Sequence, residues 1–312
     1  AGYPAPTTRT VRLATEVRKP EAFRCFYRAE LSGERAWVTR RQGSADLAAC
    51  GVTAGQLPPL VDVGASVPAR TPNPALGRSD TLKIVFAGND QTANAVSVGP
   101  RPKELIVTLG TALVVYRRAG RKAGPYHATG CWGPYSGGGY YELATRDEGC
   151  AALDWAREAL MPGAGIARFM AAAESATADA AAFFFPGRKG TKSAWAGAGD
   201  RARRARAVIE GISFTLRGLI EDDLRARPGS YSLRVQGGGS KSDFWLQLLA
   251  DILACDVRRG AGDTLLGAAM MAAGRVKPPA PAAAAAVFHP RPGAVPAYRA
   301  LYGAWKRAAG IT

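Results

Sequence analysis

The sequence predicts an α/β protein, and three stretches carry that prediction. A β-branched, apolar run broken by one Gly-Thr, at 105–116, is typical of two buried strands joined by a tight turn. Apolar residues recur at helical spacing across 205–224. Residues 231–253 read as a strand, a triple-glycine turn and an amphipathic helix. At 312 residues, the chain is long enough for two domains that each bury a core.

Further elements are expected on both sides of the 105–116 hairpin. A short strand is predicted within 81–88, followed by a small-residue helix over 92–99. The segment 146–160 is predicted to be helical, with acidic residues in its first turn. Small residues and turns dominate 161–200, and no helix is predicted there.

The last quarter of the chain also alternates between helix and loop patterns. The small-residue pattern of 263–274 predicts a helix suited to close packing. The Pro/Ala-rich stretch 278–286 is interpreted as a linker or loose turn. A terminal helix is predicted from four large side chains at helical spacing: Tyr298, Leu301, Tyr302 and Trp305.

The charge balance is strongly basic, with 41 Lys and Arg against 25 Asp and Glu and a net charge of +16. Such a balance raises nucleic acid as a partner. The excess is spread along the chain, however, and its one dense cluster, RARRAR at 201–206, leads into an apolar-periodic helix. We therefore interpret that cluster as a solvated helix start and expect no nucleic-acid partner.

Cysteine and histidine usage excludes several classes of site. The five cysteines contain no C-x-x-C pair, so neither a zinc site nor a disulfide framework is predicted, and scattered thiols fit a reducing compartment. The chain has only two histidines, so a Ser-His-Asp or Cys-His catalytic mechanism is not predicted. The apolar runs fall short of the roughly 18 residues that cross a bilayer, and no secretory leader is recognisable. We expect a cytoplasmic protein without membrane contact.

Three local patterns could bind or act on a phosphate. The turn Gly237–Gly239 precedes a helix start, where backbone N–H groups can meet an anion, although a tight strand–helix connection explains it equally well. Gly110 and Thr111 could offer an N–H and a hydroxyl to a terminal phosphate, or simply close a hairpin. Asp90 follows a strand and could act as a general base, or serve as a helix N-cap.

The order of these patterns along the chain carries more information than any one of them. Taken together, the chain resembles the FGGY carbohydrate kinase family, and its xylulokinase-like members in particular. The resemblance covers about 56–309 and rests on seven stretches in the family's order: QLPPLVDVGASV (56–67), IVFAGNDQTANAVSVG (84–99), LIVTLGTALVVY (105–116), AVIEGISFTLRGLIE (207–221), QGGGSKSDFWLQLLADILACDV (236–257), LLGAAMMAAG (265–274) and FHPRPGAVPAYRALYGAWKRA (288–308).

The resemblance implies an actin-like, RNase H-like two-domain kinase that binds ATP across its cleft. Residues 1–104 would then be the remnant of the sugar-binding domain, and 105–312 the nucleotide-binding domain. Asp90 would deprotonate the sugar hydroxyl, and Gln91 would hold the sugar. Thr111, with Gly110, would contact the transferred phosphate.

The same resemblance implies an ATP site on the glycine turn. Gly237, Gly238, Gly239 and Ser242 would lie against the nucleotide, with Gly238 and Ser242 at the adenosine. Gly149 and Asp154 fall in a segment that reaches the nucleotide in relatives. Mg2+ would arrive with ATP and bridge its phosphates, so no metal ligand from the protein is predicted. A pentulose such as xylulose is the expected substrate, because the C-terminal motifs look closest to xylulokinases.

The sequence also departs from the family's pattern. The Asp-x-Gly-Thr loop that opens the family is absent, and only 89 residues precede Asp90, where relatives have well over twice as many. We expect either a fragment of a longer kinase or a shortened paralogue. The alternative is that the chain is a catalytically incomplete, kinase-derived protein with an ATP-binding or regulatory role. A homodimer is left open.

Overall fold

The computed structural model divides the chain into two units, Ala1–Val61 and Asp62–Thr312. It describes residues 12–13, 29–32, 35–38, 66–68, 83–85, 89–101, 103–120, 130–136, 138–147, 149–187, 193–274 and 286–311, the first four of these ranges by their backbone alone. The first unit contains a small sheet in the order β1-β3-β2, built from Arg12–Leu13, Arg35–Val38 and Ala29–Ser32.

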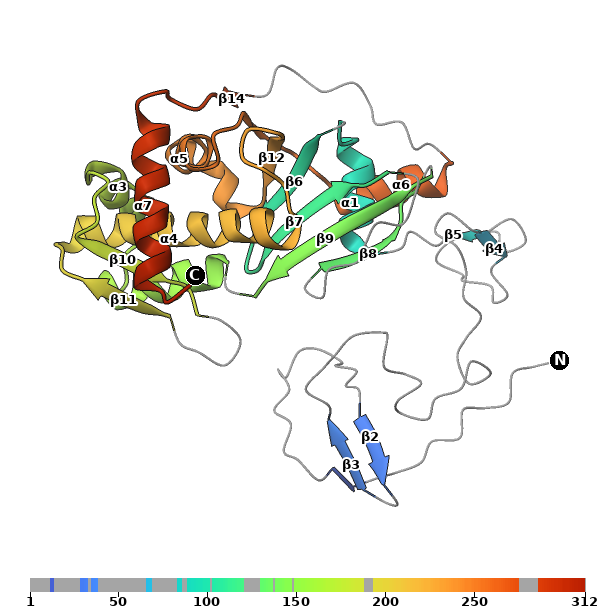
Figure 1. Ribbon diagram of the computed structural model, residues 1–312. Helices are drawn as coiled ribbons and strands as arrows, with labels where there is room; N and C mark the ends of the chain where they lie inside the picture. The colour runs from blue at the N-terminus through green and yellow to red at the C-terminus, as the bar shows by residue number, and fades with distance from the viewer. Residues whose placement is uncertain are drawn as a thin grey trace. The chain divides into compact units, whose positions relative to one another are not determined.

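The second unit is built on a seven-stranded mixed sheet in the order β14-β13-β12-β6-β7-β9-β8 (Figure 1). Strand β12 runs parallel to β6 and β13, and the other pairs are antiparallel. The predicted hairpin is confirmed as β6 and β7. The strands are β6 Glu104–Leu109, β7 Leu113–Arg118, β8 Gly130–Pro134, β9 Tyr140–Arg146, β12 Ser232–Gln236, β13 Val257–Arg259 and β14 Val287–Phe288.

Seven α-helices, one short 3-10 helix at Gly238–Lys241 and two short hairpins complete the described part of the second unit. The hairpins are β4 Ser66–Pro68 with β5 Lys83–Val85, and β10 Ala182–Phe185 with β11 Ala194–Gly197. The helices are α1 Asp90–Val98, α2 Cys150–Leu160, α3 Ile166–Ser175, α4 Arg201–Gly218 with a π-helical turn Leu219–Asp223, α5 Asp243–Leu253, α6 Thr264–Ala272 and α7 Ala294–Ala308.

The two faces of the sheet bury different helices because side chains alternate along each strand. Leu105, Val107 and Leu109 of β6 point into the main core, which α4, α5 and α7 cover. Ile106 of the same strand and Tyr116 of β7 point the other way, into a smaller cluster under α1 and α6. The helix that carries Asp90 therefore lies on the opposite face from the main core.

The predicted close packing of the 263–274 helix is confirmed at Gly267. A Cβ atom at this position would lie 1.7 Å from the carbonyl oxygen of Ala93 on α1. Only glycine allows the two helix backbones to approach this closely.

We expect Gly267→Ala to lower the free energy of unfolding by about 1–3 kcal/mol, because α6 must move away from α1. Urea denaturation followed by circular dichroism measures the change. Gly293→Ala is the matched control, since a Cβ there meets nothing within 4 Å, and it is expected to change stability by less than about 0.5 kcal/mol. Equal effects of the two substitutions would contradict the packing argument.

Several element predictions were wrong or incomplete. The helix predicted over 146–160 begins at Cys150 and has no acidic residue in its first turn, because Arg146 still pairs with Leu113 in the sheet. Helix α3 and the hairpin β10–β11 lie in 161–200, where no helix was predicted. The linker predicted at 278–286 lies, apart from its last residue, outside the described residues.

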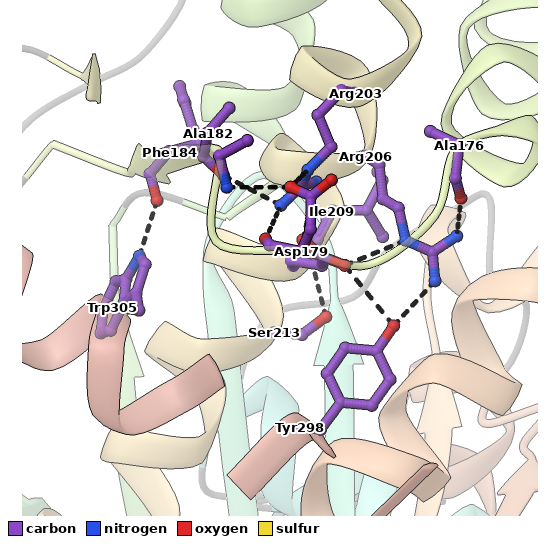
Figure 2. A network of polar contacts seen from close by, with 12 residues as sticks. Ala176, Asp179, Ala182, Phe184, Arg203, Arg206, Ile209, Ser213, Tyr298 and Trp305 are labelled. Atoms are coloured by element: carbon purple, nitrogen blue, oxygen red, sulfur yellow. Dashed lines mark hydrogen bonds and ion pairs between the residues drawn. The ribbon is translucent and has the colours of Figure 1, made fainter. Parts of the chain in front are cut away.

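The RARRAR cluster is not a solvated helix start, which corrects the prediction. Arg203 and Arg206 are only 6% and 8% exposed. Both pair with the carboxylate of Glu210, each at 2.9 Å. Figure 2 shows how the two guanidinium groups also reach the segment before β10, while Arg206 reaches Tyr298 of α7. Two buried arginines thus join α4 to the segment before β10, and Arg206 also joins it to α7.

Candidate functional site

Two of the predicted phosphate-binding turns open at the same edge of the sheet. Strands β6 and β12 are parallel neighbours, with Thr108 opposite Gln236. Gly110 and Thr111 follow the first strand, and the glycine turn follows the second. In open α/β sheets, ligands bind beyond the carboxyl ends of parallel strands.

The start of α2 closes on the Gly110-Thr111 turn. The Gly149 N–H donates to the carbonyl of Thr111 at 3.0 Å, and the Cys150 N–H donates to the carbonyl of Gly110 at 2.8 Å. The structure thus brings Gly149 to the predicted phosphate turn. It does not do so for Asp154, whose side chain is 70% exposed and pairs at 3.8 Å with Arg157 of its own helix.

Packing within the chain explains two of the three glycines in the 237–239 turn. Gly237 has φ +87°, and a Cβ on it would lie 2.6 Å from the Leu109 carbonyl oxygen. A Cβ on Gly239 would lie 2.8 Å from the Cβ of Leu109. Gly238, in contrast, is exposed, and a Cβ there would meet nothing within 4 Å. A tight connection therefore accounts for Gly237 and Gly239 but leaves Gly238 free for close approach by a ligand.

An arginine that the sequence did not single out fixes the glycine turn. Arg259 Nε donates to the Ser240 carbonyl at 2.8 Å, and its guanidinium also pairs with Asp243 at the start of α5. Ser242 caps that helix, since its Oγ accepts from the Trp245 N–H at 3.2 Å. Arg259 was missed because its strand, β13, was not predicted.

Asp90 and Gln91 occupy the first turn of α1. The N-cap role belongs to Asn89, whose Oδ1 accepts from the Thr92 N–H at 2.7 Å and whose Nδ2 donates to the Tyr141 hydroxyl at 2.7 Å. Asp90 is exposed, and its carboxylate accepts from the Gln91 N–H at 2.9 Å. Since Asn89 satisfies the cap, the Asp90 carboxylate remains accessible to a substrate.

Helix α1 is tied to the two central strands one turn beyond Asp90. The buried Gln236 donates through Nε2 to Asn94 Oδ1 at 2.8 Å and to Thr108 Oγ1 at 3.1 Å. Its amide thus connects the helix of the proposed base to the strands that end in both phosphate turns. Gln236 was not predicted from the sequence as a site residue, although it directly precedes the glycine turn.

Burial distinguishes the three cysteines among the described residues. It raises the pKa of Cys150 to about 11 and that of Cys255 to about 12, whereas Cys131 is exposed. At pH 8 we expect iodoacetamide to modify Cys131 before Cys150 and Cys255, because alkylation requires an accessible thiolate. The rates at Cys150 and Cys255 should rise as the pH approaches those pKa values. Peptide mapping by mass spectrometry measures each rate, and equal rates at pH 8 would contradict the burial.

Within the part of the chain that the structure describes, no helix is both long and apolar enough to cross a membrane. In the same ranges, no three His, Cys, Asp or Glu side chains gather closely enough to hold a metal ion.

Comparisons with known proteins agree with the resemblance read from the sequence. The family model "FGGY family of carbohydrate kinases, C-terminal domain" matches residues 105–275, more than half of the chain. A xylulose kinase of Bacillus subtilis is 25% identical over 256 residues, 76% of this chain and 51% of the relative. A xylulose kinase of Escherichia coli is 27% identical over 246 residues, 72% of this chain and 50% of the relative. The chain thus spans about half the length of the curated relatives it matches.

Solved structures support the predicted actin-like fold. The ligand-bound xylulose kinase of Lactobacillus acidophilus aligns with a TM-score of 0.72 at 20% identity, covering 88% of this chain and 62% of that one. The glycerol kinase of Plasmodium falciparum with ADP aligns with a TM-score of 0.58 at 16% identity, covering 74% and 52%. The family match, the order of the motifs and the fold agree, and the chain belongs to the FGGY family of carbohydrate kinases.

Proposed function

We propose that this chain is the nucleotide-binding and base-bearing part of an ATP-dependent carbohydrate kinase. The observation that carries the proposal is Gly238, which is exposed, has open space where a Cβ would stand, and lies at the sheet edge where the Gly110-Thr111 turn also opens. Relatives named as xylulose kinases favour a pentulose such as xylulose as the acceptor. The proposed reaction transfers the γ-phosphate of ATP to a hydroxyl of that sugar.

On the nucleotide side, the backbone at Gly238 would lie against the adenosine. Thr111, which is exposed, would offer its hydroxyl to the terminal phosphate. Gly110, whose N–H donates to the Ala112 carbonyl at 3.3 Å, would hold that turn in shape beside the phosphate. Gly149 would act through its hydrogen bond to the carbonyl of Thr111, which fixes the conformation of that turn. Mg2+ bound to ATP would neutralise charge on its phosphates.

On the sugar side, the Asp90 carboxylate would take the proton of the attacking hydroxyl. As the new P–O bond forms, the bond from the γ-phosphorus to the bridging oxygen breaks, and ADP leaves with that electron pair. Gln91 Nε2 lies 3.3 Å from Asp90 Oδ2, which supports a role in which its amide would bind a neighbouring sugar hydroxyl. Positioning and charge stabilisation would supply most of the rate enhancement.

Nucleotide binding is tested by filling the space beside Gly238. We expect Gly238→Leu to weaken ATP binding about tenfold or more by isothermal titration calorimetry, because the side chain occupies the path of the ligand. Thermal unfolding should stay unchanged. Gly165→Leu is the matched control, since it also places a leucine on an exposed glycine with no neighbour within 4 Å. Unchanged ATP affinity in Gly238→Leu would overturn this placement of the nucleotide.

Sugar phosphorylation is tested by coupled ADP release across a panel of pentuloses, polyols and hexoses. Sugar-dependent release, highest with a pentulose, is the expected result. ATP binding without any sugar-dependent release would instead support the alternative, a kinase-derived ATP-binding protein. The span of about half a relative's length keeps that alternative open to the assay.

A further inference from the structure

A basic opening lies at the end of the central strands opposite the glycine turn. It has a volume of about 710 Å³ and is lined by the start of β6, the end of β7 and the loop before β12. Because β6 and β12 are parallel, Glu104 pairs with Ser232 at this end, while Thr108 pairs with Gln236 near the glycine turn. The opening is therefore separated from the candidate kinase site by the length of the sheet.

The opening is lined by five cations and one carboxylate: Lys103, Arg117, Arg118, Arg225, Arg227 and Glu104. The carboxylate is buried and held by Arg234 at 3.0 Å. Arg117 pairs with Glu142 on the neighbouring strand.

The remaining four cations, Lys103, Arg118, Arg225 and Arg227, are exposed. Within the described ranges none of them has a carboxylate within ion-pair distance. Arg118 instead lies over the ring of Tyr135, at 4.9 Å. A local surplus of positive charge remains, which an anion would relieve.

The backbone holds two of these cations in an unfavourable conformation. Lys103 has φ +62° and Arg225 has φ +49°, in the left-handed region that glycine adopts without steric cost. Hydrogen bonds fix both segments: the Ser232 N–H donates to the Lys103 carbonyl, and the Ala226 N–H donates to the Ile220 carbonyl, each at 3.0 Å. Both cationic side chains thus extend from short turns that backbone hydrogen bonds hold in place. Residues with a strained backbone of this kind are concentrated at functional sites.

We propose that this opening is a second ligand site, which binds a compact, multiply charged phosphate chain. Guanidinium forks match phosphate oxygens in pairs, and an ammonium group adds a point charge. The opening offers three such forks and one ammonium group. Its lining contains few apolar side chains, so the recognised chemistry is the phosphates themselves.

The test is binding of inorganic triphosphate to the 312-residue chain, by calorimetry at about 0.15 M salt without Mg2+. Arg225 and Arg227 line this opening, at the opposite end of the strands from the proposed ATP site, so their substitution reports on this opening alone. We expect saturable binding there, which Arg225→Ala combined with Arg227→Ala weakens by about tenfold or more. The matched control removes two exposed cations elsewhere, Arg168 and Arg299, and should change affinity by less than about twofold.

Lys103→Gly provides a second variant that keeps the fold. Glycine suits the left-handed conformation, so thermal unfolding should stay unchanged or move to higher temperature while triphosphate affinity falls about threefold or more. A variant that is at least as stable but binds triphosphate more weakly would indicate that the strained backbone at Lys103 serves ligand binding.

Three results would overturn the proposal. One is no triphosphate binding at 0.15 M salt. Another is an equal loss in the two double variants, which would show binding to overall charge. The third is that the opening binds a single-stranded oligonucleotide but not triphosphate. It would then be a nucleic-acid-binding surface. Failure here leaves the proposed kinase function untouched, because that function is tested separately by ATP binding at Gly238 and by sugar-dependent ADP release.

Discussion

Replacing Glu210 by glutamine is expected to lower the free energy of unfolding by about 3–5 kcal/mol. The Glu210 side chain is only 2% exposed and carries the one negative charge shared by Arg203 and Arg206, each 2.9 Å away. Glutamine keeps the shape but removes the charge that pairs with the buried Arg206, and it leaves the buried Arg203 with Asp179 alone, at 2.7 Å. Guanidinium denaturation, with the midpoint and slope fitted together, measures the loss.

Glu221→Gln is the matched control for this prediction. Glu221 pairs with Arg217, four residues earlier in the chain, at 2.8 Å, just as Glu210 pairs with Arg206. The Glu221 side chain, however, is 23% exposed. Water screens that pair, so we expect a loss below about 1 kcal/mol. If Glu210→Gln were no more destabilising than Glu221→Gln, burial would not explain the contribution of the Arg203–Glu210–Arg206 cluster to the free energy of unfolding.

Asp90→Asn is expected to reduce the kcat of sugar-dependent ADP release by about 10²–10⁴-fold, the range for loss of a general base. Asparagine keeps the size of the side chain but cannot take the hydroxyl proton. The KM for ATP should stay within about twofold, because the glycine turn belongs to a different segment and Asp90 is not placed against the nucleotide. Steady-state kinetics on the preferred sugar measures both constants.

Glu158→Gln controls for removal of an exposed carboxylate away from α1, since its side chain is 60% exposed. It should leave kcat unchanged. Robust turnover in Asp90→Asn would show that another group takes the proton, and the assignment of the base would be wrong. A proportional loss in both variants would point to a general effect of charge.

The parts of the fold that could be predicted are those whose pattern is local. The β6–β7 hairpin, the glycine turn with α5, and the terminal helix each carry apolar spacing that any packing must satisfy. Strands β8 and β9 are rich in glycine and aromatics, and they are strands because they pair with β7 and with each other. Helix α3 was missed because its alanines were interpreted as turn-forming small residues, although alanine is the best helix former.

The order of the site's motifs along the chain could be predicted from the sequence, but their arrangement in space could not. The sequence showed Gly110, Gly149 and Gly238 as separate features, and the sheet register brings their segments to one edge. Burial of Arg203 and Arg206 was not predicted because their partners include Tyr298, far along the chain. The spacing of four between Arg206 and Glu210 was the one local signal that could have revealed the pair.

The parallel pairing at the middle of the sheet has a consequence for biosynthesis. Strand β6 ends at Leu109, and its partner β12 begins only at Ser232. As the chain leaves the ribosome, β6, β7, β8 and β9 can form a half-sheet whose β6 edge stays open, with unpaired N–H and C=O groups that invite association with other chains. Translation that stops before Ser232 is therefore expected to yield an aggregation-prone product, because the strand that closes the sheet is synthesised late.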